Sequence, residues 1–537
     1  MKQNTAIGTI VGRRKDWTRY SAAFQAARFA RRKWPNADLL DFCDIAPGTG
    51  LDMPSVDEWV VEVDVLSKPK SSGGQRVERL VDIFTGTLLQ SIAMEAQERL
   101  WLGSSTAGSA FGAKLGVSTA SYAAWAEAVA AWLAQQLGKG LAVVIVDFAD
   151  FFSSIPPAGI ERALADLGLE GHTSRALLAI FERINAAAAR GGGIGHGLPT
   201  MPDDIAWIVA DAVLRRLDTA VTHNASVRTY ARWVDDCYVA CDASQTEQVL
   251  QYVSELALAA GLRVNPGKVR VLRSLQDLDR VFLRPEHELL GDLLTLSSAG
   301  GDADLDLSRS VGQLAPAGPP AGPESARLVR RLFVLAASLR APQLVAAAAG
   351  YLQDYPGAER QILAYLARLG WPVRSHGVLE EALAGGGYDS RQIFALRLLL
   401  EMAPGAIPSA AHEACARILE GTLPAHDFAK TLAFAVLMDD DTAAGARRRR
   451  RFAESLGELA SAMARRVGLQ LLLLRDEATA DWGRAARDPS PLVRRFVAFA
   501  SVVPQRQGAA GVLTSRTVRG WGALQAQLMR RLLPEVR

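Results

Sequence analysis

Cysteine and long apolar runs are both scarce in this chain, and each absence excludes a class of protein. The 537 residues include four cysteines, at positions 43, 237, 241 and 415, which are too scattered for a disulfide framework. Cys237 and Cys241 both fall in an apolar stretch, so we expect buried small side chains there instead of zinc ligands. No apolar run approaches the ~18 residues of a membrane span, and none leads the chain as a signal peptide would. We therefore expect a protein of the reducing cytoplasm with no membrane segment.

Net charge is low as well, and its distribution is more informative than its total. The formal net charge is +3 and almost half of the residues are apolar, which predicts a globular chain with more than one domain. Residues 1–36 hold nine lysines and arginines against one acid, Asp16. Such an arm is suited to contact a phosphate backbone, and a solvated helix face explains it equally well.

Composition divides the chain into four segments. Residues 1–60 are basic and predicted to be mostly helical, whereas 61–295 mix strand and helix patterns. Residues 296–325 are rich in Ser, Gly and Pro, which is typical of a linker. From 326 to 537, Ala-, Leu- and Arg-rich helical segments follow one another, and one of them is expected to run from 446 to 473.

A helical repeat is indicated near the end of the chain. Residues 487–498 read Arg-Asp-Pro-Ser-Pro-Leu-Val-Arg-Arg-Phe-Val-Ala, which is similar to the entry of a HEAT-type repeat. Helix pairs of such repeats stack on one another and bury a continuous core. We therefore predict an all-α, HEAT-like domain over 326–537.

Two adjacent carboxylates, Asp235 and Asp236, stand between two short segments of strand-forming residues. Thr229–Val234 precedes them and Cys237–Ala240 follows, so we predict a tight β-hairpin with the Asp pair at its tip. Asp-Asp is also a common turn dipeptide that needs no chemical role.

A third carboxylate favours the chemical interpretation. Ala142–Val146 has the apolar pattern of a buried strand and is followed by Asp147. Two apolar strands that each deliver aspartate to one end are the minimum needed to hold two divalent metal ions. Metal ions held by carboxylates catalyse phosphoryl transfer because they stabilise both the attacking and the leaving oxygen. Asp147, Asp235 and Asp236 are therefore the candidate catalytic residues.

A basic hairpin is predicted upstream of these strands. Strand-like ends flank a Ser-Ser-Gly-Gly turn, and four cations lie along them: Lys68, Lys70, Arg76 and Arg79. A long helix with apolar periodicity is expected next, over 83–102.

Four motifs in this order resemble the palm of a reverse transcriptase. They are Asp-x-x-x-Phe-Phe-x-Ser-Ile from Asp147, Gly-Leu-Pro from Gly197, Val-Asp-Asp from Val234, and Gly-Leu-x-x-Asn-x-x-Lys from Gly261. With the basic hairpin as fingers, the resemblance covers residues 60–285 and implies a fingers–palm fold for 61–295. The fold class implied for the chain is α+β: reverse-transcriptase fingers and palm, then an all-α HEAT-like repeat domain.

The resemblance implies a metal site and a role for individual residues. Asp147, Asp235 and Asp236 would be catalytic, and with Phe148 they would hold two Mg²⁺ ions, or Mn²⁺ in their place. The substrate-binding positions would be Lys68, Lys70, Arg76, Phe152, Pro199 and Lys268.

Several of these substrate-binding roles have an alternative. The basic hairpin would grip the incoming triphosphate, and the choice between Arg76 and Arg79 as the gripping arginine is open. Phe152 is either a steric gate against the ribose 2′-OH or ordinary palm core. Lys268 either approaches the pyrophosphate or is a surface lysine.

One motif departs from the common pattern. The usual Pro-Gln-Gly is replaced by Pro199-Thr200-Met201, and Ile205 stands where a serine is usual. With Asp211 and Asp218 further on, this segment resembles the abortive-infection and other antiphage reverse transcriptases of bacteria. The resemblance implies RNA-directed or template-independent DNA synthesis in phage defence.

In some relatives DNA synthesis starts on a hydroxyl of the protein. The candidate tyrosines here are Tyr20, Tyr351, Tyr355, Tyr365 and Tyr388. The partners implied are dNTPs, a DNA product, RNA or a noncoding RNA, and further copies of this chain, with no membrane. Two alternatives are a conventional templated enzyme of the retron or intron type, and a non-catalytic module that binds nucleic acid or a phage protein.

Overall fold

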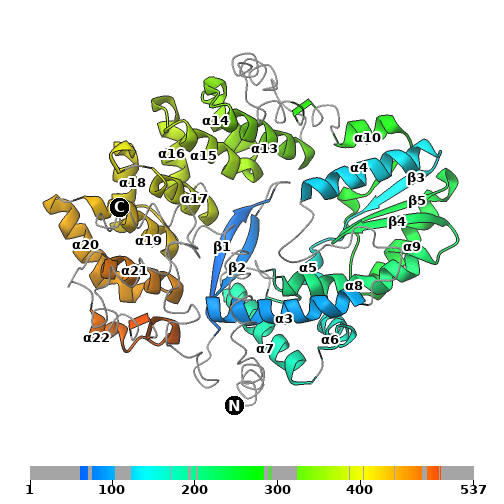
Figure 1. Ribbon diagram of the computed structural model, residues 1–537, viewed down its shortest axis with the longest axis horizontal. Coiled ribbons are helices and arrows are strands. Elements are labelled where there is room, and N and C mark those ends of the chain that lie inside the picture. Colours follow the sequence, from blue (N-terminus) through cyan, green and yellow to red (C-terminus); the bar gives the residue numbers. More distant parts are fainter. Residues whose placement is uncertain are drawn as a thin grey trace. The chain divides into compact units, whose positions relative to one another are not determined.

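The computed structural model describes most of the chain between residues 61 and 497 (Figure 1). The described residues are 61–70, 75–102, 122–169, 171–190, 195–200, 204–282, 289–290, 292, 323–385, 387–402, 404–440, 442–474, 481–494 and 496–497. The predicted basic region at 1–60 lies outside them, as does the predicted linker except for residues 323–325. The described residues form two compact units, one of 61–65 and 79–282, the other of 66–78 and the part from 289 onward.

The first unit is built on a four-stranded antiparallel sheet in the order β4-β5-β3-β6. The strands are β3 (Ala142–Val146), β4 (Val227–Trp233), β5 (Asp236–Cys241) and β6 (Arg270–Leu272). All five residues of β3 are buried, as its unbroken apolar pattern predicted, because the strand lies between β5 and β6 and is covered on both faces.

Helices cover both faces of this sheet. Figure 1 shows α4 (Tyr122–Gly138) and α10 (Leu275–Phe282) on one side, and α8 (Ile205–Thr222) and α9 (Thr246–Ala259) on the other. Alternate residues of the strands, including Val143 and Ile145, pack with Leu133 of α4 in one apolar cluster. The period of two along each strand thus supplies side chains to both layers.

The remaining helices of this unit follow the chain around the sheet. They are α3 (Ile83–Leu102), α5 (Phe151–Ser154), α6 (Pro157–Asp166) and α7 (His172–Arg190). The helix predicted over 83–102 is therefore confirmed.

The predicted basic hairpin is present as a two-stranded sheet of β1 (Val63–Pro69) and β2 (Gln75–Val81). Its turn residues, 71–74, lie outside the described residues. The base of the hairpin is joined to α3 by Asp82, whose carboxylate accepts from the Thr85 amide (2.9 Å) and hydroxyl (2.7 Å) and from the Glu62 amide (3.1 Å). The same side chain therefore begins the helix and ends the hairpin.

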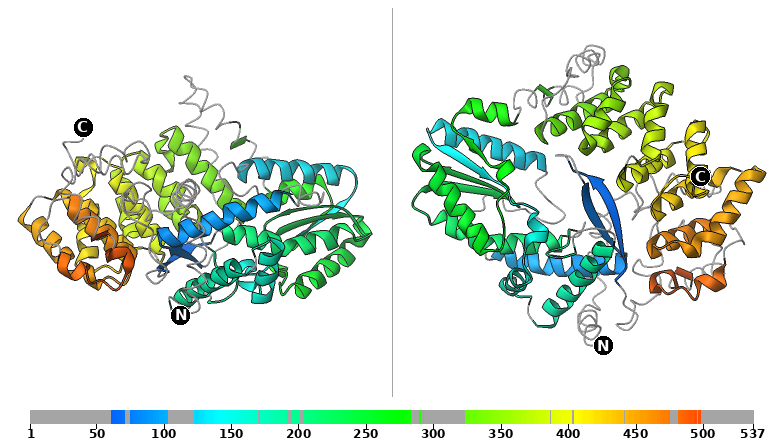
Figure 2. Two further views of the ribbon diagram at one scale, coloured as in Figure 1. Left: turned by 60° about the horizontal axis from the view of Figure 1, so that its bottom comes forward. Right: turned by 180° about the vertical axis from the view of Figure 1, so that it is seen from behind.

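The second unit contains ten described helices, most of which pack in two rows. They are α13 (Pro323–Ser338), α14 (Ala348–Asp354), α15 (Glu359–Arg368), α16 (His376–Leu383), α17 (Asp389–Leu400), α18 (Ser409–Leu419), α19 (Asp427–Val436), α20 (Ala443–Ser455), α21 (Ala462–Leu474) and α22 (Trp482–Ala485). The odd-numbered helices α13 to α21 pack each against the next odd one, and α16, α18 and α20 do the same in a second row. The succession is visible in both views of Figure 2, from green to orange.

The prediction of a single helix over 446–473 is wrong, because the helix is interrupted between α20 and α21. A short 3-10 turn, Leu456–Glu458, separates them, and its Leu456 is buried. Ser461 then begins α21 by accepting from the Ala464 amide with its hydroxyl, while its own amide donates to Asp427 (2.9 Å). The residues at 456–461 have helical propensity, which is why one continuous helix was predicted. The contact of Ser461 with Asp427 of α19 determines where the second helix begins.

The predicted α+β class is confirmed at this level: a small antiparallel sheet with its helices, followed by a long all-helical part. Among the helices that the structure describes, none is both long enough and apolar enough to cross a membrane.

Candidate active site

The strand register places the predicted carboxylates at the same end of the sheet, where β3 ends and β5 begins. Val146 at the end of β3 pairs with Cys237 of β5, so Asp147 and Asp236 are the next opposed positions. Facing positions of an antiparallel pair have Cβ atoms about 5 Å apart. Trp233 pairs with Asp236, which makes Val234–Asp235 the two-residue turn between β4 and β5. The hairpin tip is therefore one residue earlier than the predicted Asp235–Asp236.

Asp147 is buried and held by the segment after α9. Lys268 donates from Nζ to one carboxylate oxygen (2.9 Å), and the Asn265 side chain donates to the other (3.3 Å). The Asn265 amide also donates to the Asp147 carbonyl (2.8 Å), and Phe148 forms a β-bridge with Val264. The predicted Gly-Leu-x-x-Asn-x-x-Lys motif thus lies along the residues that follow β3.

The donor set fits a hard divalent cation by chemistry. Three carboxylates and the Phe148 carbonyl are oxygen donors of the kind that Mg²⁺ prefers. In the part of the chain that the structure describes, no group of three or more acidic, His or Cys side chains is closed around a possible metal position. Lys268 instead supplies the positive charge beside Asp147, so an ion that used this oxygen would have to displace its ammonium group.

Phe152 faces the start of α8. Its ring meets that of Trp207 edge-on, with centroids 5.0 Å apart, and Trp207 is itself partly exposed. The Phe152 carbonyl accepts from the Leu198 amide (2.8 Å). Asp150, which precedes α5, has a left-handed backbone with φ of 45°, and this turn directs the chain from β3 into the helix.

The Gly-Leu-Pro segment packs closely on α5. Gly197 has φ of +75°, and a Cβ there would lie 2.3 Å from the Ser153 carbonyl oxygen. Pro199 is buried, and Thr200 accepts from Arg79 Nη1 (3.1 Å). Met201, where the departure from the common motif ends, lies outside the described residues.

The two candidate gripping arginines differ in environment. Arg79 is buried, its pKa is lowered by that burial, and its contact with Thr200 belongs to the first unit. Arg76 is exposed on β2 and, with Lys68 and Lys70, belongs to the second unit. Lys68 is ion-paired with Glu78 (3.0 Å).

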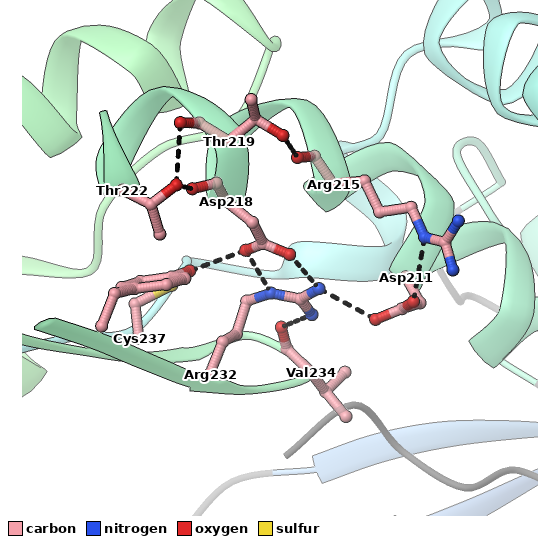
Figure 3. A network of polar contacts seen from close by, with 9 residues as sticks. Asp211, Arg215, Asp218, Thr219, Thr222, Arg232, Val234 and Cys237 are labelled. Atoms are coloured by element: carbon pink, nitrogen blue, oxygen red, sulfur yellow. Dashed lines mark hydrogen bonds and ion pairs between the residues drawn. The ribbon is translucent and has the colours of Figure 1, made fainter. Parts of the chain in front are cut away.

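A buried ion network behind the turn was not predicted from the sequence (Figure 3). Arg232 of β4 donates from Nε and Nη2 to the two oxygens of Asp218 (both 2.7 Å) and from Nη2 to Asp211 (2.8 Å). Its Nη1 donates to the carbonyl of Val234 (2.9 Å). Two signals existed: an arginine within an apolar strand needs a buried counter-charge, and Asp211 and Asp218, seven apart on a helix, share one face.

Burial and neighbouring charges shift the pKa values of three groups in this network: Arg232, Tyr230 and Cys237. Burial lowers the pKa of Arg232, but Asp218 and Asp211 outweigh it and leave the pKa well above its usual value. Burial raises the pKa of Tyr230 well above its usual value, and its hydroxyl donates to Asp218 (2.8 Å). Burial also raises the pKa of the Cys237 thiol to about 12. At neutral pH Arg232 therefore keeps its positive charge, while the Tyr230 hydroxyl and the Cys237 thiol stay protonated.

Neither family models nor curated proteins provide an assignment for this chain. A scan of the family models and a search of the curated proteins find no match.

Proposed function

We propose that this protein is a DNA polymerase of the reverse transcriptase family, of the kind that bacteria use against phage. The observation that carries the proposal is the register of β3 and β5, which sets Asp147 opposite Asp236 at one end of the sheet, with Asp235 next to Asp236 in the adjoining turn. The order of the four motifs along the chain supports it, as does Lys268 on Asp147.

The proposed reaction assigns each group a task. When bound, two Mg²⁺ ions would lower the pKa of the attacking hydroxyl and stabilise the leaving pyrophosphate. Asp147, Asp235 and Asp236 would hold these ions, with the Phe148 carbonyl as a further ligand. Phe152, backed by Trp207, would press on the sugar of the incoming nucleotide and reject a ribose 2′-OH.

The remaining residues of the proposed site would contact the triphosphate, the base pair and the pyrophosphate. Lys68, Lys70 and Arg76 would bind the triphosphate, while Arg79 would instead hold the Pro199–Thr200 segment under the base pair. Lys268, once released from Asp147, would be free to contact the pyrophosphate.

Protein priming would use a tyrosine whose hydroxyl is accessible. Tyr365 is unsuitable because its hydroxyl is buried, donates to the Ala341 carbonyl (2.5 Å) and has a pKa raised by burial to about 12. Tyr351 is buried as well, which leaves Tyr355 and Tyr388 among the described candidates. Tyr20 lies outside the described residues.

We propose further that the helical part is a HEAT-like repeat domain and that the protein acts in the cytoplasm as a homo-oligomer. The packing of alternate helices in two rows supports the repeat interpretation, since each helix then contacts only its near neighbours. The extended surface that stacked helical repeats form is suited to bind RNA or a phage component.

A second candidate function is a polymerase fold that binds nucleic acid or protein without catalysis. The observation that favours it is the occupation of Asp147 by Lys268, whose ammonium group lies where a metal ion would meet this carboxylate. The three carboxylates are nevertheless all present, which favours catalysis.

The test is nucleotide incorporation by the purified full-length protein. The protein is incubated with Mg²⁺ and each labelled dNTP without template, and the products are run on a denaturing gel with and without protease. Asp235→Ala is expected to abolish labelling, because the turn carboxylate is lost. Asp242→Ala is the matched control, since Asp242 follows the other end of β5 and its side chain is 40% exposed.

The three outcomes separate the candidates. Label that runs with the protein and disappears after protease means protein-primed synthesis without a template. Label that requires added RNA and a primer means a conventional templated enzyme. No label in any mixture would refute catalysis and leave the binding module.

A further inference from the structure

A single guanidinium joins helix α8 to the turn that carries the carboxylates. Arg232 contacts Asp218 through two hydrogen bonds, Asp211 through one, and the Val234 carbonyl through one. Figure 3 shows this fork lying between the helix and the turn. Only 2% of the Arg232 side chain is exposed; its two hydrogen bonds to Asp218 are buried, and those to Asp211 and the Val234 carbonyl are partly buried.

Stability alone does not account for this arrangement. Asp218 already neutralises Arg232 in a bidentate pair, and replacing a buried ion pair by neutral groups of similar size is often neutral or stabilising. What an apolar pair lacks is a donor to the Val234 carbonyl. To donate to that carbonyl while also binding both oxygens of Asp218 requires several N–H groups in a rigid plane, which lysine does not have.

The hydrogen bond from Arg232 is made to Val234, whose backbone conformation is strained. Val234 is the first residue of the two-residue turn and has φ of +53°. A β-branched residue in this region is strained by roughly 1–2 kcal/mol and stays there only when its surroundings hold it. Because the peptide group is planar, fixing the Val234 carbonyl also fixes the amide nitrogen and Cα of Asp235.

We propose that Arg232 is a positioning residue for the carboxylates: it holds the Val234–Asp235 turn so that Asp235 and Asp236 bind a divalent cation together with Asp147. This inference rests on the proposed function. Asp218 holds Arg232 through two hydrogen bonds, and Asp211 orients it through a third, to Nη2.

The test separates positioning from stability by removing the buried pair in two ways. Arg232→Met leaves Asp218 as an unpaired buried charge, so the melting temperature falls. In Arg232→Met/Asp218→Asn no net charge remains in the pair, and the amide oxygen introduced at position 218 can still accept from the Tyr230 hydroxyl. The double variant is expected to recover most of the melting temperature.

The decisive readout is binding of Mn²⁺ alone, measured by the electron paramagnetic resonance signal of the free ion. The double variant is expected to bind Mn²⁺ at least tenfold more weakly than the native protein, with a lower kcat and an unchanged KM for dNTP. Arg228→Met is the matched control, because Arg228 lies in the same strand but forms a partly exposed ion pair with Asp242 (2.7 Å) and does not contact the turn. It is expected to bind Mn²⁺ like the native protein.

The outcomes distinguish the two levels of the argument. A folded double variant with native Mn²⁺ affinity, beside a native protein that binds Mn²⁺ and incorporates nucleotide, overturns the role of Arg232 alone. A native protein that neither binds Mn²⁺ nor incorporates nucleotide overturns the proposed function and this inference with it.

Discussion

The Asp147 carboxylate has two competing partners, the ammonium group of Lys268 and the proposed divalent ion. One oxygen accepts from Lys268 (2.9 Å), yet the same carboxylate is the ligand that a divalent ion would need. The Lys268 side chain is 49% exposed, whereas that of Asp147 is only 6% exposed, so the ammonium group can move into water but the buried carboxylate still needs a positive partner. A divalent ion that replaces the ammonium group supplies that partner.

Lys268→Met is expected to tighten Mn²⁺ binding in the absence of nucleotide by about two- to fivefold, the factor that corresponds to removing a competing interaction of up to ~1 kcal/mol. Nucleotide incorporation is expected to slow, because the proposed pyrophosphate contact is lost. Titration of free Mn²⁺ checks the first effect. Lys139→Met, which removes the same charge between α4 and β3, is the control. Weaker binding in Lys268→Met would contradict the competition.

At the scale of elements, the Gly-Leu-Pro segment and α5 form one packed contact. Leu198 donates its amide to the Phe152 carbonyl, and His196 lies with Nδ1 2.9 Å from the Ser153 carbonyl oxygen. Gly197 makes this approach possible, because any Cβ there would overlap the Ser153 carbonyl. The helix that carries Phe152 is thus placed by backbone contacts.

Gly197→Ala is expected to lower the melting temperature by several degrees more than Gly140→Ala. Both glycines have positive φ, +75° and +79°, so both alanines incur the same backbone strain of about 1 kcal/mol. Only Gly197 lacks room, since nothing lies within 4 Å of a Cβ at Gly140. Thermal unfolding followed by circular dichroism measures the difference. Equal melting temperatures would mean that the loop moves away from α5 without loss.

At the scale of the whole molecule, the basic hairpin depends on the helical part of the chain. Asp389, the first residue of α17, accepts from the amide (2.8 Å) and the hydroxyl (2.9 Å) of Ser67, and its own amide donates to that hydroxyl (2.8 Å). These residues, 322 positions apart, belong to the same compact unit. The strand that carries Lys68 is therefore tied to the start of α17 by three hydrogen bonds.

Asp389→Ala is expected to speed hydrogen exchange at the Ser67 amide roughly tenfold, because hydrogen bonds worth about 1 kcal/mol each are lost. Mass spectrometry of peptides that cover β1 measures the rate. Asp354→Ala is the control, as Asp354 is exposed at the end of α14. Unchanged protection of Ser67 would show that the strand is held by other contacts.

Local patterns were enough to predict the elements that carry the carboxylates. The strand before Asp147, the hairpin around Asp235 and the helix over 83–102 follow from apolar period and turn residues, which act over a few neighbouring positions. The same patterns misplaced the hairpin tip by one residue, since nothing local predicts a left-handed valine at 234.

Sequence signals existed for some of the charged residues, but the carboxylate that each cation pairs with could be identified only in the folded chain. Lys268 reaches Asp147 across 121 positions, and Arg232 reaches Asp211 across 21. Such pairings follow from the strand order β4-β5-β3-β6 and from the packing of α8 on the sheet, and each buried charge takes the partner that this packing brings to it. Sequence period determines which face a side chain is on, whereas the charge it meets there depends on segments far along the chain.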